Sequence, residues 1–100
     1  MNNAQLSYHA DLLSILAHAG RLKILGLLRE KEWDVSTLAR EVRMSQSALS
    51  QHLKKMRDLK VVTTRREAQT VYYSCDHNGV ANVMRALRSI YASDTTDTAV

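Results

Sequence analysis

Residues 45–60 contain side chains that could bind a ligand through hydrogen bonds. If they form a helix with its period of 3.6 residues, one face is apolar and the opposite face carries amides and hydroxyls, followed by Lys54. Amides and hydroxyls at a helix start can contact base edges in a major groove, and later cations can hold phosphates. The polar face is Gln46, Ser47, Ser50 and Gln51, and the apolar face is Leu49, Leu53, Met56 and Leu59.

An ordinary solvated helix capped by Ser45 is the alternative interpretation. The preceding residues favour the nucleic-acid interpretation, because apolar residues recur at i, i+3, i+4 and i+7 over residues 35–42 and predict a short helix capped by Asp34. Residues 43–45 then form a tight turn. This spacing is typical of a helix-turn-helix, which we predict over residues 35–60.

Residues 61–75 change to β-branched and aromatic residues, which predicts a β-hairpin. We expect its loop at Glu67 and Ala68, with Arg65, Arg66 and Gln69 at its tip. A hairpin that follows a helix-turn-helix is a wing, whose tip can reach a phosphate backbone. In the alternative interpretation it is an edge hairpin whose arginines only prevent unwanted strand pairing.

The basic residues are concentrated in the middle of the chain. The net charge is +4 overall, whereas residues 35–73 hold eight Lys and Arg against three Asp and Glu, which is +5. Because the rest of the chain is nearly neutral, this distribution indicates a polyanionic partner, most simply nucleic acid.

The remaining apolar patterns predict three more helices, over residues 4–19, 21–31 and 76–92, with residue 20 ending the first and residues 93–100 as a disordered tail. The sequence therefore predicts one mainly α domain over residues 1–92, in the order helix-helix-helix-helix-strand-strand-helix. The apolar seam of the last helix either closes its own core or, with the first helix, forms a surface for a second copy. Its candidate dimer residues are Leu6, Leu13, Leu16, Val83, Met84, Leu87, Ile90 and Tyr91.

This order and several motifs resemble the ArsR/SmtB family of winged-helix repressors. The resemblance covers roughly residues 10–92 and is most specific in two blocks, residues 45–53 and 65–73. These blocks are most similar to the branch of the family that contains NolR, HlyU and BigR. The supporting motifs are Arg21-Leu22-Lys23-Ile24-Leu25, Leu38-Ala39, Ser45-Gln46-Ser47-Ala48-Leu49-Ser50-Gln51-His52-Leu53 and Arg65-Arg66-Glu67-Ala68-Gln69-Thr70-Val71-Tyr72-Tyr73.

The resemblance implies a homodimer, joined by its first and last helices, that regulates transcription by binding an imperfect palindrome in double-stranded DNA near a promoter. Most such proteins repress, although some activate by displacing another repressor. The alternative is a winged-helix module that binds a protein partner. The resemblance implies base contacts from Gln46, Ser47, Ser50 and Gln51, and backbone contacts from Ser45, Lys54, Lys55, Arg65, Arg66, Gln69 and Thr70.

The chain lacks the metal-ligand and cysteine-pair patterns of the family. Asp34 and Ser36 occupy the family's Cys-x-Cys positions, Asp76 alone remains of its last-helix metal site, and Gly26 and Ala92 replace its cysteine pair. We therefore expect no metal or other cofactor, and the sequence identifies no effector.

We expect the single cysteine, Cys75, to behave as a buried small apolar residue. It also fits a reducing cytoplasm, because it has no partner for an internal disulfide. The sequence contains no apolar run long enough to span a membrane and no nucleophile–base pair or phosphate loop, so we expect neither a membrane partner nor an enzyme.

Overall fold

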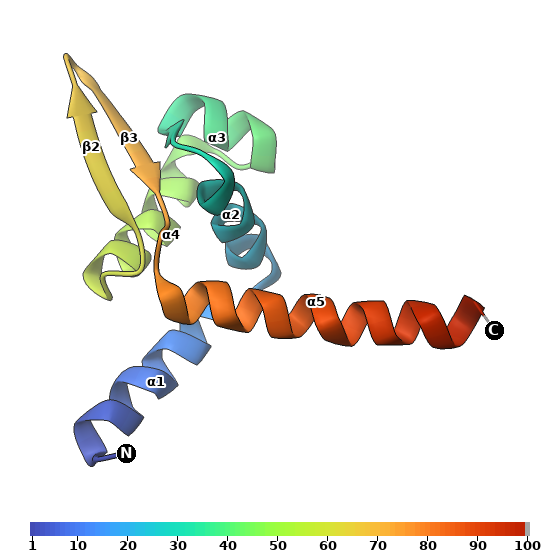
Figure 1. Ribbon diagram of the computed structural model, residues 1–100. Helices are drawn as coiled ribbons and strands as arrows, with labels where there is room; N and C mark the ends of the chain where they lie inside the picture. The colour runs from blue at the N-terminus through green and yellow to red at the C-terminus, as the bar shows by residue number, and fades with distance from the viewer. Residues whose placement is uncertain (100) are drawn as a thin grey trace.

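The computed structural model describes the backbone of residues 1–99 and the side chains of residues 1–90. It is a mainly α winged helix-turn-helix, as predicted, with five helices and a three-stranded antiparallel sheet (Figure 1). No helix among the described residues is both long and apolar enough to cross a membrane. The elements are α1 (Asn3–Leu16), α2 (Ala19–Glu30), β1 (Trp33–Asp34), α3 (Val35–Val42), α4 (Gln46–Asp58), β2 (Thr63–Glu67), β3 (Thr70–Ser74) and α5 (Asn78–Ala99).

The core is the apolar side of α2, α3 and α4, closed by the start of α5 and the end of α1. Ile24, Leu25 and Leu38 have no exposed surface, and Val80 of α5 is equally buried. Leu16 is 4% exposed and belongs to this core, so the prediction that it lies in a dimer interface is wrong. α1 carries apolar residues on more than one side, and the side at Leu12 and Leu16 is the one that the protomer itself covers.

The sheet has one more strand than predicted. β1 lies between the helices predicted over residues 21–31 and 35–42, where no strand was predicted, and it pairs antiparallel with β3, so the strand order is β1-β3-β2. β1 is only two residues long, too short to show a period-2 pattern. The β2–β3 hairpin, the wing, turns at Ala68 and Gln69 rather than at Glu67 and Ala68, and Ala68 adopts a left-handed φ of 55°.

The ends of α1 and α5 differ most from the predicted helix boundaries. α1 ends at Leu16 rather than near residue 19, because the His18 side chain accepts a hydrogen bond from the Arg21 backbone and caps α2. α5 continues as helix to Ala99 through most of the predicted disordered tail, and no glycine or proline after Gly79 interrupts it.

α1 and the outer part of α5 extend from the body as two diverging arms (Figure 1). The core therefore covers these two helices only near their junction. This arrangement leaves most of each arm without a neighbour in the protomer, while α3, α4 and the wing lie together on the body.

Candidate nucleic-acid interface

α4 is fixed by its apolar stripe, which leaves its polar face outward. Leu49, Leu53 and Met56 are each no more than 1% exposed. The Ser45 hydroxyl accepts a hydrogen bond from the Ala48 backbone at 3.1 Å and so caps the helix, as predicted. Burial of the stripe allows α4 only one rotation about its axis, and this rotation determines which side chains meet solvent.

The outward face of α4 carries the four side chains predicted to contact bases. Gln46, Ser47, Ser50 and Gln51 are all exposed. The Gln46 amide donates a hydrogen bond to the Ser36 hydroxyl of α3 at 3.1 Å. Amide and hydroxyl groups can both donate and accept hydrogen bonds, which is the chemistry needed to distinguish base edges.

The helix-turn-helix geometry depends on two local features. The Asp34 carboxylate caps α3 by accepting from the Thr37 backbone at 3.1 Å, and hydrogen bonds from Thr37 hold the pKa of Asp34 below its usual range. α3 ends at Arg43, whose left-handed φ of 57° turns the chain toward α4. Met44, in this turn, is half-buried against the core.

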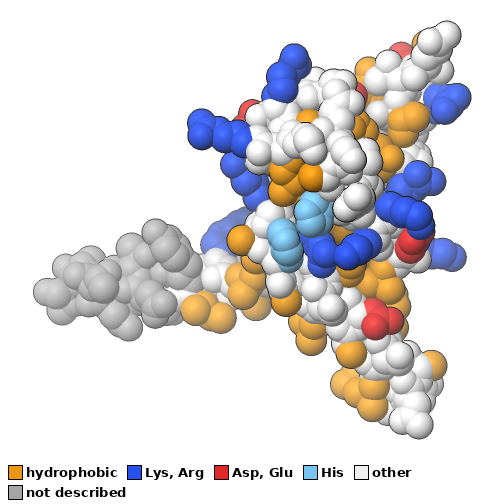
Figure 2. Space-filling model, turned by 180° about the vertical axis from the view of Figure 1, so that it is seen from behind, with side chains coloured by type: hydrophobic (Ala, Val, Ile, Leu, Met, Phe, Trp, Pro, Cys, Tyr) orange, Lys and Arg blue, Asp and Glu red, His pale blue; other side chains and the backbone are white. Residues whose placement is uncertain are grey.

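The predicted backbone contacts are exposed cationic and polar groups around α4 and the wing. Lys54 forms an ion pair with Asp58 at 2.9 Å, but the two side chains are 75% and 65% exposed, so solvent and salt screen this pair. Lys55, Arg66, Gln69 and Thr70 are also exposed. Figure 2 shows Lys and Arg side chains distributed over the body.

A hollow of about 500 Å³ lies between α4 and the wing. It is lined by Ser50, Lys54, Arg57 and Asp58 of α4 and by Tyr73 of β3. Because the polar face of α4 leads into it, one continuous polyanion could contact both the helix and the wing.

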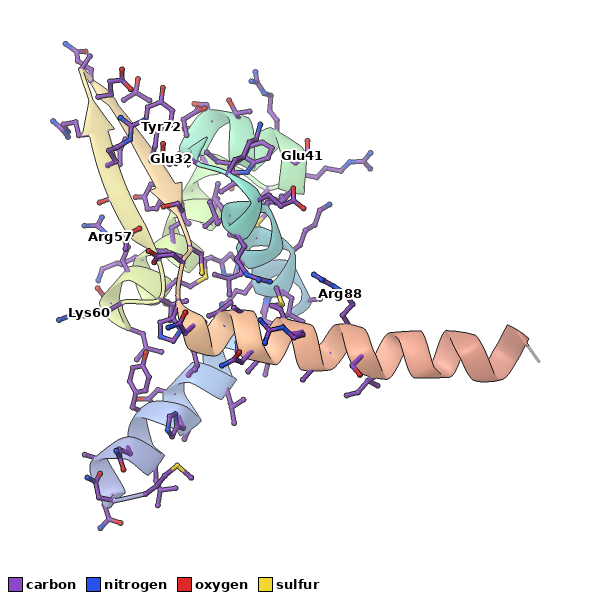
Figure 3. The ribbon with its side chains drawn as sticks, viewed as in Figure 1. Glu32, Glu41, Arg57, Lys60, Tyr72 and Arg88 are labelled. Carbon is purple, nitrogen blue, oxygen red and sulfur yellow. The ribbon has the colours of Figure 1, made fainter. Side chains whose placement is uncertain are left out.

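Arg65, a predicted phosphate contact, is instead held by carboxylates. Its guanidinium pairs with Glu32 at 2.9 Å and with Glu67 at 3.0 Å, and it lies 5.0 Å from the centre of the Tyr72 ring. Hydrogen bonds from Arg65 also lower the pKa of Glu32. Figure 3 shows Glu32 and Tyr72 together beside the wing.

Sequence reasoning did not identify a polar contact that connects α4 to α2. The Arg21 guanidinium donates a hydrogen bond to Nδ1 of His52 at 3.1 Å, and the rings of His52 and His18 lie 4.9 Å apart. Burial, followed by the charge of Arg21, lowers the pKa of His52. No sequence pattern identified these partners of His52.

The two arms expose four of the eight apolar residues predicted to form a dimer interface. Leu6, Leu13, Leu87 and Ile90 are 48%, 57%, 42% and 60% exposed, respectively. Figure 2 shows hydrophobic side chains along both arms. Val83 and Met84 are half-buried against the core, and the Tyr91 side chain lies outside the described residues.

An apolar groove of about 480 Å³ lies where the arms meet. The Tyr8 hydroxyl of α1 and Nε2 of His77 are hydrogen-bonded across this junction at 2.8 Å. The groove is lined by Tyr8, His9, Leu12, Leu13, His77, Gly79, Asn82 and Val83.

The described side chains contain no cluster of three or more His, Cys, Asp and Glu that could hold a metal ion. Cys75 is buried, as predicted, and burial raises the pKa of its thiol. A buried thiol with a raised pKa is a poor nucleophile.

Comparisons with known proteins agree with this geometry. The model of the arsR family of bacterial regulatory proteins matches residues 18–64. Nodulation protein NolR of Rhizobium meliloti is 49% identical over 86 residues, which cover 86% of this chain and 70% of that protein. The crystal structure of NolR from Sinorhizobium fredii is 45% identical, covers 88% of each chain and has a TM-score of 0.84.

Two further similar proteins are a transcriptional activator and a DNA-binding domain. Transcriptional activator HlyU of Vibrio cholerae is 41% identical over 80 residues, or 80% of this chain and 74% of that protein. The solution structure of Mb0332 from Mycobacterium bovis is described as a homodimeric winged helix-turn-helix DNA-binding domain. It is 26% identical, covers 92% of this chain and 88% of that one, and has a TM-score of 0.79. HlyU and Mb0332 are thus named as a transcriptional activator and a DNA-binding domain rather than as enzymes, and this chain belongs to the ArsR family of bacterial regulatory proteins.

Proposed function

We propose that this protein is a homodimeric, sequence-specific DNA-binding repressor that recognises an imperfect palindrome in a promoter. The observation that carries this proposal is the outward face of α4, where Gln46, Ser47, Ser50 and Gln51 are exposed beside a capped helix start. A polar face without acids at the start of a helix is suited to reading bases. In this role the protein would act in the cytoplasm, where bacterial DNA lies.

The backbone contacts of this proposal surround the base-reading face. Ser45, Lys54 and Lys55 would hold phosphates on one side of the major groove, while Arg66, Gln69 and Thr70 of the wing would hold the backbone beyond it. These groups are exposed, and the hollow between α4 and the wing has room for a phosphate backbone. Such contacts release counterions, so the affinity should fall steeply with salt concentration.

The apolar arms support the dimer. Leu6, Leu13, Leu87 and Ile90 expose about half of their surface on two helices that diverge from the core. A second copy related by a two-fold axis would cover these side chains on both protomers at once. The two copies of α4 would then read two half-sites related by the same axis, which explains why a palindrome is expected.

The test is binding of the purified protein to a random duplex pool, with selection of the bound fraction, followed by titrations across a salt series. We expect an enriched palindromic site whose affinity falls with salt, and a weaker, equally salt-dependent affinity for random duplex. Absence of enrichment and of salt dependence would refute DNA recognition and leave the protein-interaction module as the better interpretation. Transcription from a promoter that carries the selected site then distinguishes repression from the activation named for HlyU.

A further inference from the structure

Arg65 is held on three sides by groups of the same protomer. Its Nε and Nη2 donate to the Glu32 carboxylate at 2.9 and 3.1 Å, a two-point contact that fixes the plane of the guanidinium. Its Nη1 donates to Glu67 at 3.0 Å, and its cation lies over the Tyr72 ring. Glu32 lies in the connection between α2 and β1, so the contact links β2 to a connecting segment 33 residues earlier in the chain.

This Arg65 cluster is unsuited to a phosphate. One guanidinium and two carboxylates sum to a net charge of −1, so the group as a whole repels a polyanion at close range. These carboxylates use three of the five N–H groups of the guanidinium, so a phosphate would have to compete with both of them for Arg65. An arginine with these partners stabilises a particular wing orientation rather than the protein–DNA contact.

The strand register places Arg65 and Arg66 on opposite faces of the wing. Arg65 is opposite Tyr72, and Tyr72 is opposite Asp34, so these three side chains share one face of the sheet. Arg66 is opposite Val71 and lies on the other face with Tyr73.

The face of Arg66 is also the one that looks toward α4. Tyr73 lines the hollow together with Ser50 and Lys54 of α4, so the face of the wing that carries Tyr73 is the one that faces α4, the proposed recognition helix. The described side chains include no ion pair of Arg66. The positive charge of Arg66 is therefore available to a partner that enters between α4 and the wing.

We propose that Glu32 and Arg65 form a clamp that sets the angle of the wing relative to the recognition helix, and that Arg66, not Arg65, binds the phosphate. Arg65 and Glu32 are then positioning residues. The inference rests on the proposed DNA-binding function, since the wing angle matters only when α4 and the wing hold the same duplex.

The discriminating variant is Glu32→Gln, because two models predict opposite effects on affinity. Removing an acid close to DNA ordinarily strengthens binding, and it would also free Arg65 for a phosphate. If the clamp positions the wing, the same change weakens binding to the selected duplex about 2- to 5-fold, which is the upper part of the range for an exposed charge pair. Glu41→Gln is the matched control, since Glu41 lies on α3 away from the wing (Figure 3) and the change removes the same charge without touching Arg65.

A second pair of variants separates phosphate binding from positioning. Arg66→Gln should lower the slope of log affinity against log salt by about 1, the value for one lost phosphate contact, whereas Arg65→Gln should weaken binding with an unchanged slope. The exchanged variant Glu32→Arg with Arg65→Glu keeps the ion pair in reverse and should recover part of the affinity lost by Arg65→Glu alone. A purely electrostatic contribution of Arg65 to DNA binding would instead be additive, so that Glu32→Arg would raise the affinity by the same factor in the unaltered protein and in Arg65→Glu.

The outcomes also separate this inference from the proposed function. If the unaltered protein shows no salt-dependent DNA binding, the proposed function fails before any variant is compared. If it binds and Glu32→Gln binds equally well or better, with Arg65→Gln lowering the salt slope, the clamp is refuted and the DNA-binding function stands. Unchanged thermal unfolding of Glu32→Gln establishes that its effect is not loss of the fold.

Discussion

Leu87 on α5 offers the most direct test of the proposed dimer. It is 42% exposed on an arm that the core does not cover. Full burial of a leucine side chain contributes roughly 1.5–3 kcal/mol, so covering the exposed part contributes about 1 kcal/mol in each protomer. Because a two-fold dimer interface contains Leu87 of both protomers, its apolar contribution to dimer stability is about 2 kcal/mol.

Leu87→Glu should weaken dimerisation by more than this apolar contribution. Each protomer would bring an unpaired carboxylate into the interface, and an unpaired buried charge costs several kcal/mol. We expect a total loss of at least about 4 kcal/mol, or about a thousandfold in the dissociation constant.

Sedimentation over a range of protein concentrations measures this change. The matched control is Ser89→Glu, which adds the same charge on the opposite side of α5, two residues and about 200° further along the helix. We expect the control to remain dimeric at concentrations where Leu87→Glu is a monomer. Equal dissociation constants for the two variants and the unaltered protein would show that the dimer, if present, does not use this face.

Three further predictions concern the helix-turn-helix and the wing. Gln46→Ala should cost about 1–3 kcal/mol on the selected duplex and little on random duplex in competition titrations, and equal losses on both would exclude base reading by Gln46. Asp34 caps α3, and the hydrogen bonds from Thr37 lower the folded-state pKa of Asp34 below 3.8. The cap therefore stabilises the fold above pH 3.8, and this stabilisation is lost as the pH falls through the folded-state pKa. Urea unfolding from pH about 2 to about 6 should therefore show a weaker pH dependence for Asp34→Asn than for the unaltered protein, and parallel curves would contradict this reasoning. Ala68→Gly should stabilise the fold by about 0.5–1 kcal/mol, because φ is 55° there, and a lower urea midpoint would show that the left-handed turn is not strained.

Local periodicity made the helix-turn-helix and the wing predictable from sequence. Leu49, Leu53 and Met56 recur at helical spacing, and all three are buried, so the face opposite them had to be exposed. The change to β-branched residues after residue 60 likewise located the wing to within a few residues. These predictions use neighbours within one or two turns of chain, where sequence spacing determines geometry.

The errors arose where geometry depends on distant residues. β1 is a strand only because it pairs with β3. Trp33 and Asp34 are opposite Tyr73 and Tyr72, about forty positions later in the chain. Leu16 is buried because the core that covers it is built from residues of α2, α3, α4 and the start of α5, which lie outside its own helix.

Within the candidate interface, too, the contacts that the sequence did not predict join residues of different elements. They are hydrogen bonds between polar groups of separate helices. Arg21 of α2 donates to His52 of α4 and to the Ile15 carbonyl near the end of α1. His52 follows Gln51 directly, on the inward side of the recognition helix, so this contact holds the helix from behind. The direction in which the base-reading side chains point therefore depends on residues that never touch a ligand, just as the wing angle depends on Glu32. Periodicity in the sequence identifies the face that binds, whereas its orientation comes from pairs that only the fold brings together.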